Sequence, residues 1–312
     1  MNFKILLCLF VLTFNAFAHS LCNLDIEIIA PSSGVCAAVY KKILNITGQN
    51  VEQSGISTKS SNDQVFVNQR EKFKILRNSL ASPHRIIWAL RGGYGLSRIM
   101  PDIVNTDYST VVPKTIIGYS DITPLLIFLS QKYNWTAISG VMLKDVAQND
   151  KSRDSYDVLF NFLRGKIKEL KMTGLTPMNN TARTKANIVG RVTGGNLTCI
   201  VTTIGTSWQI ETNNKIVLLE DVGLKGYHLD RTLTHMENAG LFRGVVCIIF
   251  GDFSCDVSNV LKNFADRINV PVYKTDKFGH GKINLPFVYN SLGTVTKSGE
   301  KFEIVMKTAG IG

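Results

Sequence analysis

The chain has 312 residues, of which 45% are hydrophobic and 19% are charged, and its formal net charge is +11. This composition is that of a globular protein rather than a disordered one, and the length is sufficient for two domains of ordinary size. A basic surface favours anionic partners, but the lysines and arginines are scattered without an interleaved aromatic platform. The charge therefore does not predict nucleic-acid binding.

The first eighteen residues have the pattern of a cleaved secretory signal. A short basic start at 1–4 precedes an almost wholly apolar run at 5–16, and Ala16-Phe17-Ala18 supplies the small-x-small pattern of a signal-peptidase site. The apolar run is too short for a stable membrane anchor. We therefore expect cleavage after Ala18 and a periplasmic protein with no stable membrane anchor.

Apolar β-rich runs then alternate with segments of helical periodicity, which is typical of an α/β protein with a largely parallel sheet. In the first half, strands are predicted over 24–30, 86–90 and 114–119, and helices over 37–44 and 122–133.

In the second half, a polar stretch at 147–154 breaks the pattern. A helix is predicted over 157–170, and the Gly-, Pro- and Asn-containing segment 172–184 resembles a crossover between domains. Four further strands are predicted over 186–192, 215–219, 245–250 and 270–274. The expected division is a signal peptide (1–18), an N-terminal domain (19–150), a crossover (151–185) and a C-terminal domain (186–312).

Export leaves five cysteines in the mature chain, and an oxidising compartment permits disulfides. Because five is odd, at least one thiol stays unpaired within the chain, and the pairing of the others is open. Cys247 lies in an apolar β-branched run and is predicted to pack in a buried strand. No spacing of His and Cys is typical of a metal site, so we expect neither metal nor cofactor. The five are Cys22, Cys36, Cys199, Cys247 and Cys255.

Ser120 lies where the strand 114–119 meets the helical segment 122–133. Such a strand–Ser–helix junction places one hydroxyl on a sharp turn at the positive end of a helix dipole. A nucleophile needs that exposure, and its oxyanion needs backbone N–H groups without helical partners. Serine is also a preferred helix N-cap, so capping is the alternative role for this residue.

Two glycine-rich turns follow strands in the same way, at 91–95 and 193–197. Glycines at a strand end let backbone N–H groups approach an anion, either a phosphate or an oxyanion. Neither the dinucleotide fingerprint nor the phosphate-loop lysine is present. A tight turn without a ligand is the alternative.

An acid and a histidine complete the set. Glu220 and Asp221 follow the strand 215–219, where carboxylates of parallel sheets point into the ligand crevice. A solvated strand end, or an ion pair with Lys225 or Arg231, is the alternative for that acid. His280 is flanked by glycines on a loop, where an exposed histidine without a catalytic role is the alternative. The chain order Ser, acid, His is that of an α/β-hydrolase, but Ile122 replaces the last glycine of the Gly-x-Ser-x-Gly elbow.

Seven motifs, in order and spacing, resemble those of the LD-carboxypeptidase family of serine peptidases, which includes the microcin C immunity proteins. The resemblance covers roughly residues 24–295. The motifs are Ala30-Pro31-Ser32-Ser33, Arg91-Gly92-Gly93-Tyr94-Gly95, Gly118-Tyr119-Ser120-Asp121-Ile122-Thr123, Gly194-Gly195-Asn196-Leu197, Leu219-Glu220-Asp221-Val222-Gly223, Asp230-Arg231 and Phe278-Gly279-His280-Gly281.

The resemblance implies a fold and a set of site residues. The fold would be a Rossmann-like N-terminal domain with a parallel sheet and a smaller α/β C-terminal domain, with the active site between them. Ser120 would be the nucleophile, Glu220 the triad acid and His280 the general base. The backbone N–H of Asp121, with one from Gly92 or Gly93, would form the oxyanion hole. The residues expected to bind substrate are Arg91, Tyr94 and Asn196.

The implied reaction removes the terminal D-alanine from a peptidoglycan tetrapeptide stem, after the L-centre of a diamino acid, and the implied assembly is a homodimer. The expected partner is thus a muropeptide or peptide stem. One departure is Ser139-Gly140-Val141, where the family usually has His-Gly-Pro; another is the export signal. The alternatives are an immunity-type peptidase acting on peptidyl or aminoacyl nucleotides, and a non-catalytic periplasmic protein that binds wall peptides.

Overall fold

A computed structural model describes residues 21, 24–48, 69–185 and 187–308. The predicted signal peptide and Cys22 lie outside these residues. The first of two sheets has the strand order β1-β2-β3-β4-β10. Its first four strands run parallel, and β10 pairs antiparallel with β4. The strands are β1 (Ile26–Ile29), β2 (Ile86–Ala89), β3 (Thr115–Gly118), β4 (Thr136–Ser139) and β10 (Phe287–Val288).

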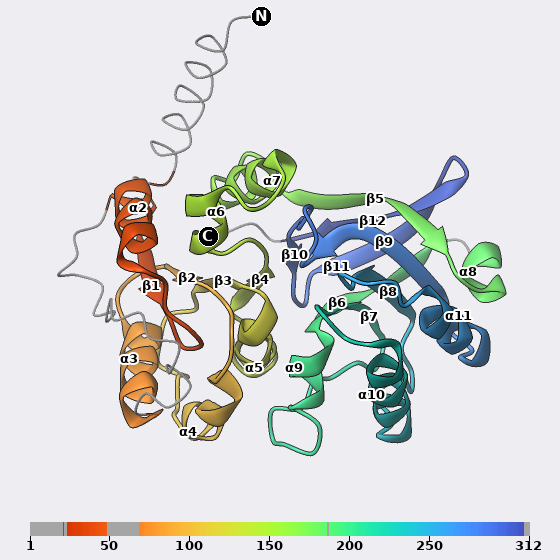
Figure 1. The fold of residues 1–312 in the computed structure, drawn as a ribbon, viewed down its shortest axis with the longest axis horizontal. Coiled ribbons are helices and arrows are strands. Elements are labelled where there is room, and N and C mark those ends of the chain that lie inside the picture. The colour runs from red at the N-terminus through yellow and green to blue at the C-terminus, as the bar shows by residue number, and fades with distance from the viewer. Residues whose placement is uncertain (1–20, 22–23, 49–68, 186, 309–312) are drawn as a thin grey trace, which may run out of the picture.

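Helices flank this first sheet (Figure 1). Strands β2 and β3 are buried along their whole length. Their sequences are therefore largely continuous apolar runs, without the alternation of apolar and polar residues that a half-exposed strand shows. The helices are α2 (Ala37–Thr47), α3 (Gln69–Ala81), α4 (Met100–Val104), α5 (Thr123–Tyr133), α6 (Leu143–Gln148) and α7 (Arg153–Leu163).

The second sheet closes into a barrel in the order β11-β12-β5-β9-β8-β7-β6. Four neighbouring strands are parallel, and the other three pair antiparallel. The parallel strands are β6 (Ile188–Asn196), β7 (Lys215–Glu220), β8 (Cys247–Asp252) and β9 (Val272–Gly279). The others are β5 (Glu169–Pro177), β11 (Leu292–Ser298) and β12 (Lys301–Lys307). The helices of this half are α8 (Asn180–Thr184), α9 (Leu197–Val201), α10 (Gly226–Asn238) and α11 (Ser258–Arg267).

The expected fold class, a parallel α/β sheet with a second α/β domain, is confirmed by this arrangement. Two predictions for the segment that joins the sheets are wrong. The helix expected over 157–170 begins earlier, at Arg153, and ends at Leu163. Residues 169–177 form β5, in which Leu170 and Met172 are buried at alternate positions, and a β-bulge then shifts the alternation so that Leu175 is the next buried residue. In the sequence, the Gly, Pro and Asn residues that predict a crossover outweigh this short alternation.

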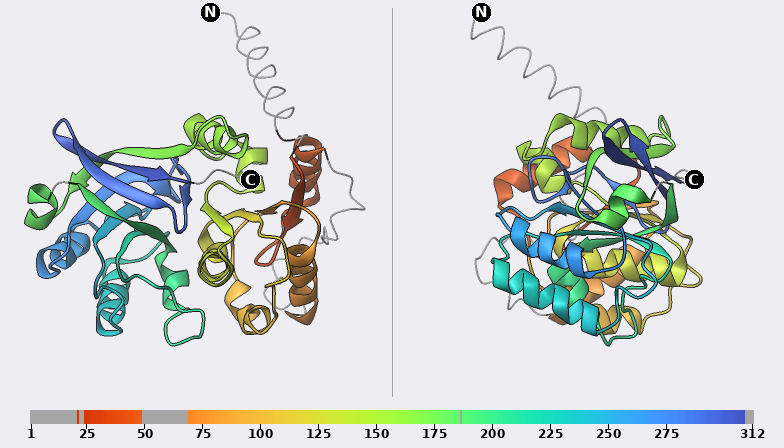
Figure 2. Two further views of the ribbon diagram at one scale, coloured as in Figure 1. Left: turned by 180° about the vertical axis from the view of Figure 1, so that it is seen from behind. Right: turned by 90° about the vertical axis from the view of Figure 1, so that its right-hand side faces the viewer.

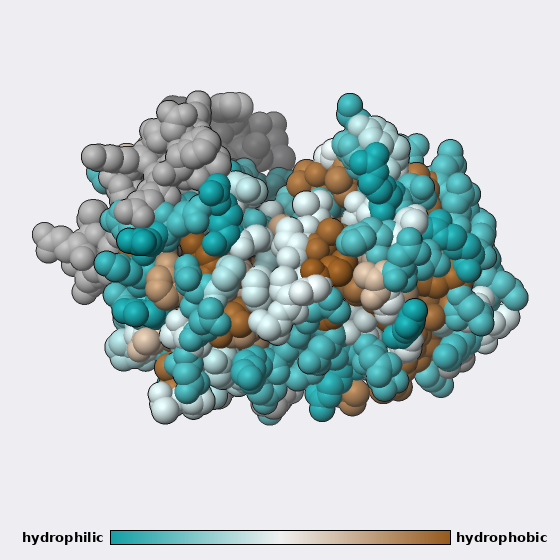
Figure 3. Space-filling view, turned by 90° about the horizontal axis from the view of Figure 1, so that it is seen from below, coloured by the Kyte–Doolittle hydropathy of each residue, from teal (hydrophilic) through white to brown (hydrophobic). Residues whose placement is uncertain are grey.

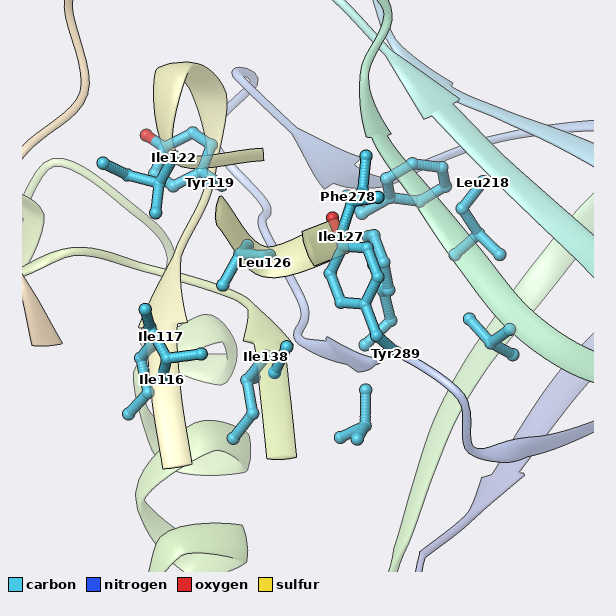
Figure 4. Packing of buried hydrophobic residues seen from close by; sticks show 14 of the residues in the cluster. Ile116, Ile117, Tyr119, Ile122, Leu126, Ile127, Ile138, Leu218, Phe278 and Tyr289 are labelled. Carbon is cyan, nitrogen blue, oxygen red and sulfur yellow. The ribbon is translucent and has the colours of Figure 1, made fainter. Parts of the chain in front are cut away.

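The two sheets lie side by side and share one hydrophobic core (Figure 2). Helix α5 contacts both α9 and β6 at their boundary. Figure 4 shows Ile127 of α5 beside Phe278 of β9 and Tyr289, which follows β10. The carboxyl ends of β3, β7 and β9 therefore carry their loops toward the same boundary.

Hydrophobic residues on the surface are dispersed. The face in Figure 3 is mostly hydrophilic, with brown residues in separate patches. Within the described ranges, no helix combines the length and the apolarity needed to span a membrane. The exposed large hydrophobic side chains come from different segments and are Tyr94, Val112, Val189, Val222, Tyr227 and Leu292.

The four described cysteines are free thiols: Cys36, Cys199, Cys247 and Cys255. Cys247 is fully buried at the start of β8, as expected for a packing residue.

Candidate active site

Ser120 follows β3 in a conformation that serine rarely adopts, with a φ of 61°. Left-handed backbone is uncommon outside glycine and costs free energy, and such strain concentrates at functional sites. A short 3-10 helix, η4 (Ser120–Ile122), leads from this residue into α5. The N-cap residues of η4 and α5 are Tyr119 and Ile122, neither of which makes a side-chain cap hydrogen bond, and Ser120 is at neither N-cap. The structure thus contradicts the capping alternative for Ser120.

The first glycine turn packs directly on Ser120. A Cβ atom built on Gly92 would lie 2.9 Å from Ser120 Cβ and 3.0 Å from its Oγ, so only glycine permits this approach. The Asp121 carboxylate accepts the Leu96 N–H at 3.0 Å and ties the turn after β3 to the loop after β2. Burial raises the pKa of Asp121 above its ordinary value. The structure therefore brings the two predicted motifs together.

Glu220 ends β7, and His280 follows β9. His280 Nδ1 lies 2.6 Å from Glu220 Oε2, and the Glu220 side chain is 4% exposed. With a carboxylate as acceptor, Nδ1 carries the proton and Nε2 is left as the basic nitrogen. Asp221 has other partners: its carboxylate accepts the N–H groups of Thr198 at 2.8 Å and Val222 at 2.7 Å. The first acid after the strand, rather than the second, therefore reaches the histidine.

Burial and neighbouring charges set the pKa of His280. Burial lowers this pKa, the hydrogen bond and the negative charge of Glu220 raise it, the positive charge of Lys151 lowers it, and the negative charge of Asp221 raises it. The contribution of Glu220 prevails, so the pKa of His280 is raised above its ordinary value.

Ser120 and His280 lie on neighbouring segments. The His280 ring centroid is 5.1 Å from that of Tyr119, the residue before Ser120. No hydrogen bond of the described residues joins Ser120 Oγ to His280; the histidine bond that is present goes to Glu220. Catalytic hydrogen bonds are often long in ligand-free sites and shorten when substrate binds. Glu220 and His280 are thus paired, and the turn that carries Ser120 lies beside them.

The other expected site residues differ in their surroundings. Tyr94 is 54% exposed, whereas Asn196 is buried. The Asn196 side chain caps α9 by accepting the Cys199 N–H, and its amide donates to Asp221 at 3.2 Å. Arg91 donates to the carbonyl of Gly34 at 3.3 Å. Substrate binding by these three residues stays a prediction, and for Asn196 both polar groups of the side chain already have structural partners.

The motif order does not identify Lys151, which the structure places against residues 279–281, the loop that carries His280. Lys151 is buried, and its ammonium donates to the carbonyls of His280 at 2.8 Å and Gly281 at 2.7 Å. It lies within the polar stretch 147–154, where a single lysine has no periodic or motif signal. No pattern in the sequence therefore indicates a role for Lys151.

Acidic, histidine and cysteine side chains do not gather into a metal site: in the described part of the chain, no group of three or more of them could hold an ion.

Two family models match the sequence. They describe the LD-carboxypeptidase N-terminal domain, over residues 26–140, and the LD-carboxypeptidase C-terminal domain, over residues 189–295. The chain belongs to the LD-carboxypeptidase family.

Relatives within this family carry carboxypeptidase names. A Rickettsia conorii protein, whose name calls it a candidate carboxypeptidase, is 40% identical over 318 residues, which cover 98% of each chain. The murein tetrapeptide carboxypeptidase of Pseudomonas aeruginosa is 24% identical over 282 residues, which cover 85% of this chain and 90% of the relative.

Solved structures share the fold. A muramoyltetrapeptide carboxypeptidase from Oxalobacter formigenes has a TM-score of 0.77 at 21% identity, covering 91% of this chain and 98% of its own. The microcin C7 self-immunity protein, without ligand, has a TM-score of 0.73 at 19% identity, covering 93% and 98%. The recognised family and the expected two-domain fold are thus confirmed.

Proposed function

We propose that this member of the family is a serine LD-carboxypeptidase that releases the terminal D-alanine from peptidoglycan tetrapeptide stems. The observation that carries the proposal is the 2.6 Å Glu220–His280 hydrogen bond beside a serine that is strained and does not cap its helix. The murein tetrapeptide carboxypeptidase among the relatives supports the substrate class.

The mechanism is acyl transfer through Ser120. Its Oγ attacks the carbonyl carbon of the diamino acid, and His280 Nε2 takes the hydroxyl proton. The imidazolium that forms is stabilised by Glu220, which also fixes the Nδ1–H tautomer. The proton then passes to the leaving nitrogen, D-alanine departs, and an ester remains on Ser120. Water, deprotonated by His280, hydrolyses that ester.

Backbone donors for the oxyanion are available around Ser120. The N–H groups of Gly92, Gly93 and Asp121 make no hydrogen bond to other backbone or side-chain groups of the described residues. Gly92 packs on the serine, and Asp121 follows it in the chain. Preorganised N–H groups at such a position contribute several kcal/mol to the stabilisation of a developing oxyanion, on the order of 3 kcal/mol for each donor.

Chromatography of a purified disaccharide tetrapeptide, incubated with wild type and with Ser120→Ala, tests this proposal. We expect wild type to release D-alanine and leave the tripeptide, and Ser120→Ala to be slower by about 10³-fold or more because the nucleophile is lost. Ser109→Ala, at an exposed serine outside the site motifs, should match wild type.

Two further substrates sharpen the result. A tetrapeptide ending in L-alanine should stay uncut, since the proposed enzyme cuts before a D-centre. Aspartyl sulfamoyl adenosine, a ligand bound by the microcin C7 self-immunity protein in a solved complex, distinguishes the immunity-type alternative. Cleavage of that nucleotide without release of D-alanine would overturn the proposal, and so would unchanged D-alanine release by Ser120→Ala. Tetrapeptide binding without turnover would favour the non-catalytic alternative.

A further inference from the structure

We infer that Lys151 is a positioning residue that holds the histidine loop, residues 279–281, against the nucleophile turn. The inference rests on the function proposed above, because it assigns Lys151 a task in the same reaction. Lys151 follows α6 in the first half of the chain, whereas the histidine loop follows β9 in the barrel. One side chain thus connects the segment that carries the base to the half that carries the nucleophile.

The hydrogen bonds of Lys151 enclose His280. Its Nζ donates to the carbonyls of Gly281 at 2.7 Å and His280 at 2.8 Å, and it lies 3.5 Å from that of Gly279. An ammonium has three donors, and these carbonyls account for all three. No carboxylate of the described residues lies within ion-pair distance of Lys151. The ammonium is therefore dedicated to the backbone on both sides of the imidazole.

The same ammonium contacts the nucleophile side. It lies 5.4 Å from the ring centroid of Tyr119, a cation–π contact with the residue before Ser120. The Tyr119 ring is buried and packs 5.1 Å from the His280 ring. Lys151, Tyr119 and His280 therefore form one packed group. Loss of the lysine would allow the His280 imidazole to shift relative to Ser120.

Backbone contacts support this arrangement on one side. The Ser152 N–H donates to the carbonyl of Lys282 at 2.7 Å, and the Asn284 N–H donates to Ser155 Oγ at 2.8 Å. Asn284 in turn accepts the Gly279 N–H at 3.1 Å. These bonds fix the chain after His280, so removal of the Lys151 ammonium leaves the loop attached and changes mainly the position of the imidazole.

The positive charge has a second consequence. A buried ammonium costs free energy, and burial lowers the pKa of Lys151, while neighbouring carboxylates raise it. The Lys151 charge opposes protonation of His280, which must be neutral to act as a base. The charged and titratable groups facing this pair are Glu220, Asp221, Tyr119, Asp145, Asp150 and Asp252.

Lys151→Met tests both effects, since methionine is of similar length and has neither donors nor charge. We expect kcat for D-alanine release to fall about 10- to 100-fold with a small change in KM, as a displaced catalytic group does. The acid limb of the kcat/KM profile should move to higher pH, because loss of the positive charge raises the pKa of His280. Lys151→Arg should lower kcat, because a planar guanidinium cannot reproduce the contacts, but should keep the limb in place.

Lys297→Met is the control. Lys297 is exposed on β11 and, in the described part of the chain, takes no part in the contacts of the histidine loop. Its loss should leave both kcat and the pH profile unchanged. A purely structural role for Lys151 would lower the melting temperature without moving the acid limb, and that result would overturn the inference.

An NMR titration of isotope-labelled histidines gives a readout without substrate. His280 is assigned by its absence in His280→Gln, and its pKa is compared in wild type and Lys151→Met. We expect a higher pKa in Lys151→Met. Equal values, together with unchanged kcat, would overturn the inference. If wild type releases no D-alanine, the proposed function fails, while this titration still reports whether Lys151 acts on His280.

Discussion

Glu220 and Asp221 are adjacent in sequence, yet their carboxylates have different partners. Alternation along an extended backbone turns successive side chains to opposite sides. Glu220 accordingly binds the imidazole of His280, and Asp221 binds N–H groups near the start of α9. Glu220 Oε1 is buried and has no partner among the described residues, so His280 is the hydrogen-bond partner that this carboxylate has there.

Glu220→Gln should therefore slow D-alanine release on the order of 10³-fold, because a neutral amide cannot stabilise the imidazolium or fix its tautomer. Since Glu220 raises the pKa of His280, its loss should move the acid limb of kcat/KM to lower pH. This shift is opposite in direction to that expected for Lys151→Met. Steady-state rates from pH 5 to 9 measure it, and Glu211→Gln, at an exposed glutamate, is the control. A limb that stays in place would contradict this assignment of Glu220.

The order of short motifs predicts Ser120, Glu220 and His280, because each follows an apolar strand and adjoins glycine or acid residues of a recognisable kind. Lys151 is different. Its task depends on carbonyl groups, which any residue supplies, and on a partner segment 128 to 130 positions away. Such a contact leaves no pattern in a single sequence.

At the scale of elements, the second glycine motif belongs to a strand rather than to a turn. The sequence predicts a strand that ends at 192 and a turn over 193–197, but β6 continues to Asn196 and pairs with β7 as far as Glu220. A Cβ atom on Gly194 would lie 1.8 Å from the carbonyl oxygen of Leu218. Glycine is needed at 194 because β6 and β7 approach closely there. From sequence alone, a glycine required by such an approach cannot be distinguished from a glycine in a turn.

Gly194→Ala should accordingly destabilise the barrel. Both the close contact and a φ of +141° oppose a side chain, and we expect a loss of about 2 kcal/mol or more. In a chain of this size that corresponds to a melting temperature lower by about 3 °C or more. Thermal unfolding followed by circular dichroism measures it.

Gly174→Ala is the comparison for that prediction. Gly174 also lies in a barrel strand at positive φ (+80°), but nothing lies within 4 Å of its built Cβ. Its substitution should cost only backbone strain, about 1 kcal/mol. Equal effects of the two substitutions would show that φ, rather than the contact with Leu218, requires glycine at 194.

Strands that are apolar along most of their length are predicted well, and very short or alternating strands are not. The runs around β2, β3, β7 and β8 are buried and read directly from sequence. The two-residue β10 is too short to have a period, and β11 and β12 alternate with polar residues. Closure of the barrel depends on these weaker strands, so the sequence predicts the class of the second domain but not its closed form.

At the scale of the whole molecule, the cell compartment depends on a segment outside the described residues. If the first eighteen residues are a secretory signal, the mature protein begins at His19. Expression in a bacterium, followed by mass spectrometry of the periplasmic fraction, measures that N-terminus. Ala18→Arg should block processing, because a signal peptidase requires a small residue there. A full-length chain recovered from the cytoplasm would contradict the expected export.

The position of β10 has a consequence for how the chain can be divided. After supplying β6 to β9 to the barrel, the chain returns to pair Phe287 and Val288 with β4, and then rejoins the barrel as β11. A fragment ending between α7 and β5 would leave the edge of β4 unpaired, with backbone groups free to recruit another chain. The histidine loop lies on this returning stretch, anchored at one end in the barrel and at the other in the first sheet. The two halves are therefore interlocked, and neither can be exchanged as a module without rebuilding the candidate active site.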